Sequence, residues 1–156
     1  MVVGNEFVCI FVSLNPFIMN GISLDLDDPR VGIDNLGRMV CFHGRYRLGD
    51  KHTYNHNDYS GWEEMKNAII KENDVCVILP LYLYDHSGIT MNTTGFSCRW
   101  DSGQVGWIYA TKKDVREWCG IKKITKPYVD KVNEILLEEV KMYDRYIRGE
   151  EDESEE

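Results

Sequence analysis

A run of five consecutive apolar residues, Val75–Leu79, constrains the fold of this chain more than any other feature. Three of the five are Val or Ile, whose branched side chains favour strands. Pro80 follows the run and lacks the N–H group that a central strand needs. Over Leu81–Tyr84 leucine and tyrosine then alternate, which places two tyrosines on one face. We therefore predict a buried strand that stops at Pro80.

Three further segments have strand-like patterns. Glu6–Leu14 and Gly37–His43 are apolar runs typical of buried strands. Gly95–Tyr109 alternates on both sides of a turn at Asp101–Gly103, which predicts a hairpin, and Gly88–Thr94 is expected to be a polar connection. The hairpin faces would hold Phe96, Cys98 and Trp100 on one strand, and Val105, Trp107 and Tyr109 on the other.

Three helices are expected. Ser60 and Glu63 have capping-box spacing, so a helix should begin there and end near Asn73. Thr111 and Asp114 open a short helix that Gly120 ends. A third helix begins near Thr125 and Pro127 and has an apolar stripe that favours docking on the sheet: Val129, Val132, Leu136, Val140, Tyr143 and Ile147.

These elements predict one α+β domain over residues 1–149, with a mainly antiparallel sheet of four to six strands, three helices and the C-terminal helix docked on the sheet. Six of the last seven residues are acidic, so 150–156 is expected to be a disordered tail. Without this tail the net charge of −8 falls to −8 + 6 = −2. An acidic mimic of nucleic acid is therefore not indicated.

The sequence also bears on location. No apolar run approaches about 20 residues, so we expect no membrane span. The first residues lack a basic segment and a small-residue cleavage site, so a signal peptide is not expected. The five cysteines are an odd number, are scattered and form no CxxC motif, which favours free thiols in a reducing cytoplasm.

Four residues form a candidate acid/base centre: His43, Asp85, His86 and Asp101. Asp85 and His86 follow a strand, and a carboxylate beside a histidine can tune a general base. A turn in which Asp85 and His86 bond only to the backbone is the alternative. Such a centre would make the protein a small metal- or acid/base-dependent hydrolase or nuclease.

Other chemistry is less favoured. A metal site could combine Cys41 and His43 with His86 and Asp85 or Asp101, and a nuclease could use Asp85, Asp101 and Lys112. A thiol nucleophile at Cys98 is disfavoured because its predicted strand face is apolar. We expect neither a cofactor nor a bound metal.

A binding surface is the leading interpretation. Tyrosine, tryptophan and arginine dominate protein interfaces, and they gather in the middle of this chain. The residues expected to bind are Arg45, Tyr46, Arg47, Tyr82, Tyr84, Arg99, Trp100, Gln104 and Trp107. Arg45, Arg47, Lys51 and His52, interleaved with Tyr46, Tyr54 and Tyr59, would also suit single-stranded nucleic acid.

Three segments carry a family resemblance: Met39–Asp50, Leu79–Gly88 and Thr94–Tyr109. They cover roughly the middle half of the chain, and the motifs PLYLYDHSG and TGFSCRWDSGQVGWIY are the specific ones. They resemble a recurrent family of small proteins encoded by viruses of bacteria and archaea, prophages and other mobile elements. Members often have Pro where this chain has Arg99. The resemblance implies a phage or mobile-element origin and a cytoplasmic setting in the host cell, but no mechanism.

Together these observations predict a phage or mobile-element accessory protein that binds a host protein or nucleoprotein complex, in the manner of an anti-CRISPR or anti-restriction factor. This expectation rests on the resemblance and on the aromatic composition. Nucleic acid is the alternative partner, and the hydrolase centred on His43, Asp85, His86 and Asp101 is the alternative function.

Overall fold

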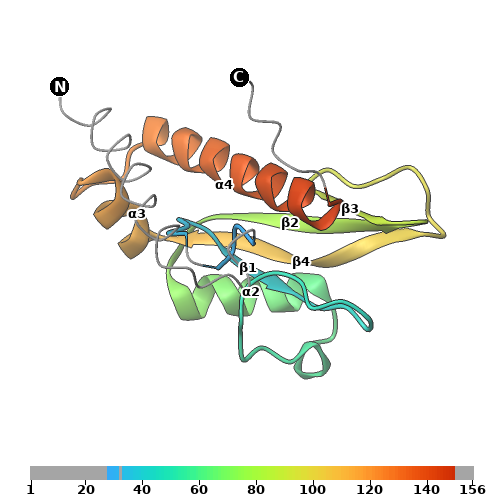
Figure 1. Ribbon diagram of the computed structural model, residues 1–156. Helices are drawn as coiled ribbons and strands as arrows, with labels where there is room; N and C mark the ends of the chain where they lie inside the picture. Colours follow the sequence, from blue (N-terminus) through green and yellow to red (C-terminus); the bar gives the residue numbers. More distant parts are fainter. Residues whose placement is uncertain (1–27, 32, 150–156) are drawn as a thin grey trace, which may run out of the picture.

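The computed structural model describes residues 28–31 and 33–149 (Figure 1). The elements in chain order are β1 (Arg38–Cys41), the 3-10 turn η2 (His56–Asp58), α2 (Trp62–Asn73), β2 (Val75–Asp85), β3 (Ile89–Asn92), β4 (Ser102–Thr111), α3 (Lys112–Cys119) and α4 (Lys126–Ile147). The strand expected at Glu6–Leu14 and the acidic tail at 150–156 lie outside the described residues.

The four described strands form one antiparallel sheet in the order β1-β4-β2-β3. Helix α4 lies along one face of this sheet and α2 lies on the other, which gives three layers (Figure 1). The prediction of an α+β domain with a docked C-terminal helix is therefore confirmed.

The end of β2 and its hairpin partner differ from the prediction. This strand does not stop at Pro80 but continues to Asp85, with Pro80 opposite Trp107 of β4. The hairpin partner of β2 is β3, and the turn between them places Ser87 and Gly88 at positive φ. The predicted hairpin within Gly95–Tyr109 is wrong, since β4 pairs with β2 and residues 93–101 form a loop.

Strand β3 was not predicted because its sequence is polar. Its Thr90 hydroxyl and Met91 N–H both donate to the Asp144 carboxylate of α4, each at 2.7 Å. A distant helix therefore satisfies polar groups that sequence alone would place in a loop.

A bulge in β4 changes which side chains face which helix. Leu81 of β2 lies opposite Gly106, but Tyr82 lies opposite Gln104, so Val105 is the extra residue. Val105 consequently packs in the core below α4, whereas Trp107 and Tyr109 pack on the α2 side. The prediction that these three share one face is wrong because the bulge resets the alternation.

The larger core lies between the sheet and α4. It includes Met39, Leu81 and Ile108 from the sheet and the α4 stripe, of which Val132, Leu136, Val140 and Tyr143 are buried. The smaller core holds Val40, Met65, Ile69, Trp107 and Tyr109 under α2. Burying apolar area at about 25 cal/mol per Å² makes these two layers the main source of stability.

Local signals set the helix ends largely as expected. The Asp114 N–H donates to the Thr111 hydroxyl at 3.1 Å, and Gly120 closes α3 at a φ of 65°. At the start of α2, however, Ser60 donates to Glu64 rather than pairing with Glu63, and Gly61 is the N-cap.

A buried arginine joins segments that are far apart in sequence. The Arg30 side chain is only 2% exposed and donates to Asp50 through Nε and Nη2, at 2.9 and 2.6 Å. It also donates to Glu139 of α4 at 2.9 Å and to the Gly37 carbonyl at 2.7 Å. The carboxylates accept backbone N–H groups in turn, Asp50 from Met39 and Glu139 from Gly37. Every member of the network is thus partnered.

Burial and neighbouring charges together shift the pKa values of Arg30 and Glu139. Burial alone would lower the pKa of Arg30, but the hydrogen bonds and charges of Asp50 and Glu139 outweigh it and raise the pKa. Burial also raises the pKa of Glu139 above its ordinary value, and the charge of Arg30 offsets only part of that rise. Arg30 is therefore the fixed charge of the network.

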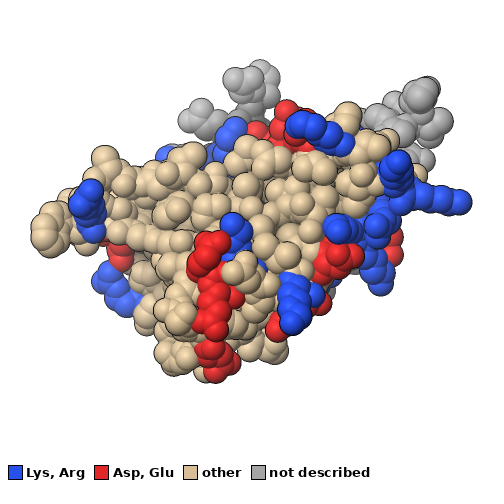
Figure 2. All heavy atoms as spheres, turned by 180° about the vertical axis from the view of Figure 1, so that it is seen from behind, with Lys and Arg blue, Asp and Glu red and all other residues tan. Residues whose placement is uncertain are grey.

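The outer edge of β2 is only half covered. Strand β3 pairs with Tyr82–Asp85, and no described strand pairs with Val75–Pro80 on that side. Leu81 and Leu83 are buried, whereas every residue of Val75–Pro80 is half-buried, as Tyr82 and Tyr84 are. No charged residue occurs between Val75 and Tyr84, and a view from behind shows a broad surface without charged side chains (Figure 2).

Among the described residues, no helix is both long and apolar enough to span a membrane.

Substitution of Gly106 tests the close pairing of β1 with β4. A Cβ at this position would lie 1.9 Å from the Val40 carbonyl oxygen, so Gly106→Ala should push the two strands apart. We expect it to lower the free energy of unfolding by at least about 2 kcal/mol, measured by urea denaturation. Gly103→Ala is the matched control in the same strand, where a Cβ meets no atom within 4 Å. Equal stability of the two variants would contradict the close approach.

Substitution of Arg30 tests how much the buried network stabilises the fold. Arg30→Ala leaves two carboxylates without their cation and should cost about 3–5 kcal/mol in urea denaturation. Arg38→Ala is the control, because its pair with Asp114 is exposed and should contribute at most about 1 kcal/mol. Similar losses in both variants would show that the network does not hold the fold together.

Candidate functional site

Three loops meet at one end of the sheet. They are the segment after β1, the turn after β2 and the loop 93–101 before β4. The Asp85 N–H donates to the Asp101 carbonyl at 2.7 Å, and Arg45 forms an ion pair with the Asp85 carboxylate. His86 Nδ1 lies 3.2 Å from Asp101 Oδ2. We call this region the sheet-end surface.

The structure brings the four predicted catalytic residues together as two separate pairs. His43 Nε2 lies 3.9 Å from Asp85 Oδ2, and His86 contacts Asp101. His43 Nδ1 accepts the N–H groups of Arg45 and Tyr46 at 3.0 and 3.2 Å. Its proton is therefore on Nε2, and the acceptor nitrogen that a general base needs is already occupied.

The metal and thiol alternatives gain no support. Within residues 28–31 and 33–149 no group of three or more His, Cys, Asp or Glu side chains could hold a metal ion. Cys41 is buried in the core below α4, and burial raises the pKa of its thiol to about 12. Cys98 lies 3.9 Å from Asp101 but is not in a strand, and Lys112 pairs with Asp74 instead of the catalytic candidates.

The predicted binding residues divide into exposed and buried groups. Trp100 is 94% exposed, and Arg45, Tyr46, Arg47 and Arg99 are also exposed in the loops. Tyr82, Tyr84 and Gln104 are half-buried in β2 and β4. Trp107 is only 5% exposed, beneath the Lys66 ammonium group, so it belongs to the core and not to the surface. Alternation alone could not separate Trp100 from Trp107.

Aromatic contacts join some side chains of the sheet-end surface. The His43 and Tyr46 rings lie 4.9 Å apart, and Arg45 lies 5.6 Å from the Tyr46 ring. On the other side of Asp85, Tyr84 packs on His86 and Phe96, with ring centroids 6.0 and 5.6 Å away. The sheet-end surface therefore holds two groups of aromatic and basic side chains, one around the Asp85 carboxylate and one around that of Asp101.

Loop 93–101 is fixed by side-chain bonds to its backbone. Asn92 accepts the N–H groups of Thr94 and Gly95 and donates to the Gly95 carbonyl. Ser102 donates to the Cys98 carbonyl, and Phe96 packs on Tyr84. These contacts hold the loop that presents Trp100.

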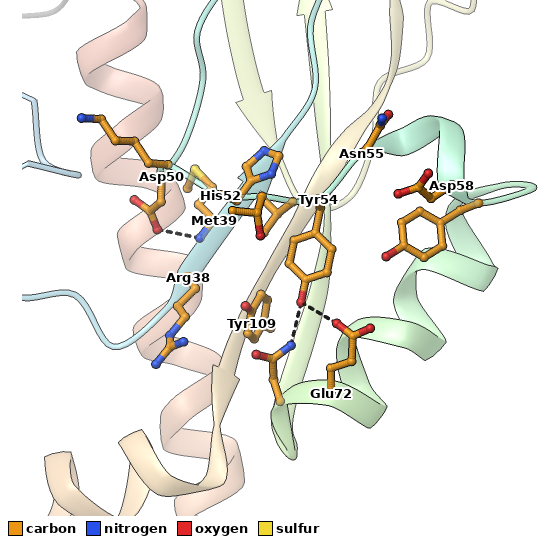
Figure 3. A pocket seen from close by; sticks show the side chains of 14 residues that line it. Arg38, Met39, Asp50, His52, Tyr54, Asn55, Asp58, Glu72 and Tyr109 are labelled. Atoms are coloured by element: carbon orange, nitrogen blue, oxygen red, sulfur yellow. Dashed lines mark hydrogen bonds between the residues drawn. The ribbon is translucent and has the colours of Figure 1, made fainter.

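A polar cavity of about 540 Å³ lies between the segment after β1 and helix α2 (Figure 3). The Tyr54 hydroxyl sits in its middle, accepting from Asn73 at 2.8 Å and donating to Glu72 at 3.4 Å. His52 Nε2 donates to the Cys41 carbonyl, which leaves the buried Nδ1 without a hydrogen-bond partner. Arg38 and Lys51 also line the cavity, but so do Asp50, Asp58 and Glu72.

A second cavity, of about 530 Å³, adjoins the sheet-end surface and is lined by Cys41 of β1, Trp62 of α2 and residues of the segment between them, among them His43, Tyr46, Arg47 and His52. Of the four catalytic candidates only His43 lines either of these two cavities. The basic and aromatic residues after β1, which the sequence suggested for nucleic-acid binding, therefore line both cavities. Sequence analysis missed Arg38, Glu72 and Asn73, which β1 and α2 contribute to the polar cavity.

Comparison of the chain with protein-family models, curated proteins and solved structures found no match. The resemblance to mobile-element proteins therefore stays a prediction.

Tyr109 provides a pH test of the polar cavity. Burial, with the neighbouring Tyr54, raises the pKa of Tyr109 from 10.0 to about 12. A folded pKa above the unfolded value stabilises the fold below pH 10, and this contribution is lost as the pH rises through 12. Relative to Tyr109→Phe, the wild type should lose roughly 2 kcal/mol between pH 9 and 12 in urea denaturation. A constant difference across that range would contradict the burial of this hydroxyl.

Proposed function

We propose that the protein is a phage or mobile-element accessory factor that binds a host protein or nucleoprotein complex through its sheet-end surface. The observation that carries this proposal is Trp100, which is 94% exposed on a loop that side-chain bonds hold in place. Tryptophan and arginine are the residues that most often dominate binding energy when a partner buries them.

The chemistry of the surface favours a protein partner. Arg45 and Asp85 neutralise each other, as His86 and Asp101 do when the histidine is charged, so the surface is mixed in charge. Single-stranded nucleic acid needs a continuous positive groove, and the adjacent polar cavity includes Asp50, Asp58 and Glu72. A mixed aromatic and charged surface is typical of protein interfaces.

We place the protein in the cytoplasm of the infected cell, where it would act as an anti-CRISPR or anti-restriction factor. The motifs at Leu79–Gly88 and Thr94–Tyr109 support this placement through their resemblance to mobile-element proteins. The alternative is an acid/base hydrolase, which the exposed His86–Asp101 pair favours.

Affinity purification from a lysate of the bacteria that carry the element tests both functions. We expect a stoichiometric partner, at least about tenfold depleted with Trp100→Ala. Met142→Ala, an exposed apolar residue on α4, is the matched control and should retain the partner. The His43→Ala/His86→Ala double variant should also retain it.

Two results would overturn the binding function. One is a partner that Trp100→Ala and the wild type retain equally. The other is a hydrolytic activity that the double variant lacks while no stable partner co-purifies, which would favour the alternative.

A further inference from the structure

The polar cavity between the segment after β1 and helix α2 has the composition of a ligand site. Its volume of about 540 Å³ lies in the range of pockets that hold small molecules. Tyr54 and Tyr59 are half-buried in its wall. Four charged residues of the wall are exposed, so a dissolved ligand can reach them: Arg38, Lys51, Asp58 and Glu72.

The charges of the cavity are divided between two sides of Tyr54. Figure 3 shows Arg38 on one side of the Tyr54 ring, and Asp58 and Glu72 on the other. Asn73 donates to the Tyr54 hydroxyl at 2.8 Å, which holds the ring between the two groups. A ligand that fills the cavity therefore meets a basic end and an acidic end.

Arg38 and Lys51 form the basic end. The segment after β1 turns back antiparallel to the strand and makes a bridge between Val40 and Gly49. In that register Lys51 lies opposite Arg38, and opposite residues of an antiparallel pair point to the same face. Arg38 also pairs with Asp114 at 2.9 Å, so its charge is already shared.

Asp58 and Glu72 form the acidic end. Within residues 28–31 and 33–149, the Glu72 carboxylate accepts only the Tyr54 hydroxyl, at a long 3.4 Å, and the Asp58 carboxylate accepts no hydrogen bond. Burial raises the pKa of Tyr59, and the charges of Glu72 and Asp58 are among those that raise it further. Both carboxylates therefore act on the Tyr59 hydroxyl, and a cation bound by them would lie near an aromatic ring.

The balance of charge selects the kind of ligand. The third carboxylate of the wall, Asp50, is already paired with Arg30. The remaining groups are more acidic than basic, because Arg38 is shared with Asp114. A nucleotide would add further negative charge and suits the cavity poorly. A ligand with a net positive charge and one carboxylate complements both ends.

We propose that the polar cavity binds the free amino acid arginine, with its guanidinium group on Asp58 and Glu72 and its α-carboxylate on Arg38 and Lys51. A guanidinium group presents a planar fork of N–H donors that can serve two carboxylates and stacks on aromatic rings, whereas an ammonium group is a point charge. This inference goes beyond the proposed function and does not depend on it.

Calorimetric titration of the full chain with L-arginine tests the proposal. We expect saturable binding, and at least about tenfold weaker binding of citrulline, the uncharged isostere of arginine. Nα-acetyl-arginine amide, which represents an arginine within a protein chain, should also bind at least about tenfold more weakly because it lacks the carboxylate.

Two results of the titration would overturn the proposal. One is arginine that does not bind at about 10 mM, or that binds no better than citrulline. The other is equal affinity for arginine and the acetylated amide, since an arginine side chain of a partner protein would then be the occupant.

Substitution of Glu72 locates the site. Glu72→Gln should weaken arginine binding at least about tenfold, because the exposed side chain keeps its size and loses its charge. Glu63→Gln is the matched control, with the same change at an exposed position of α2 outside the cavity wall, and should bind as the wild type does. Equal arginine affinity of the two variants would overturn the assignment to this cavity.

Discussion

The fold depends on one buried guanidinium group. Arg30 bonds to the segment after β1 through Asp50, to α4 through Glu139 and to the start of β1 through the Gly37 carbonyl. These groups come from parts of the chain up to 109 residues apart. Because a buried charge without partners is costly, the network allows one arrangement of these segments and disfavours others. It thereby positions β1, and with it the loop that lines both cavities.

Local patterns predicted the elements whose signals are contained within them. The α4 stripe from Val132 to Tyr143 follows helical spacing, and the Thr111 cap and Gly120 termination of α3 depend on neighbours in sequence. Such features need no knowledge of tertiary contacts. The fold class followed from them and from the apolar run that became β2.

Features that depend on distant partners could not be predicted. The polar segment Ile89–Asn92 becomes a strand because Asp144 of α4 accepts its polar groups. The bulge at Val105 reverses the expected faces, and only the register of β2 against β4 reveals it. In the candidate site, sequence identified the sheet-end residues and the tract after β1. It could not show that Trp107 is buried or that the two histidines pair with different aspartates.

Trp100 also has an optical consequence. Of the four tryptophans in the chain, Trp62 and Trp118 are half-buried, Trp107 is buried, and Trp100 is almost fully exposed. Indole fluorescence depends on the polarity of its surroundings, so the emission of Trp100 should be the most red-shifted of the four and the most accessible to aqueous quenchers. The chain thus carries an exposed intrinsic fluorophore in loop 93–101, and contact with Trp100 can be followed without a label.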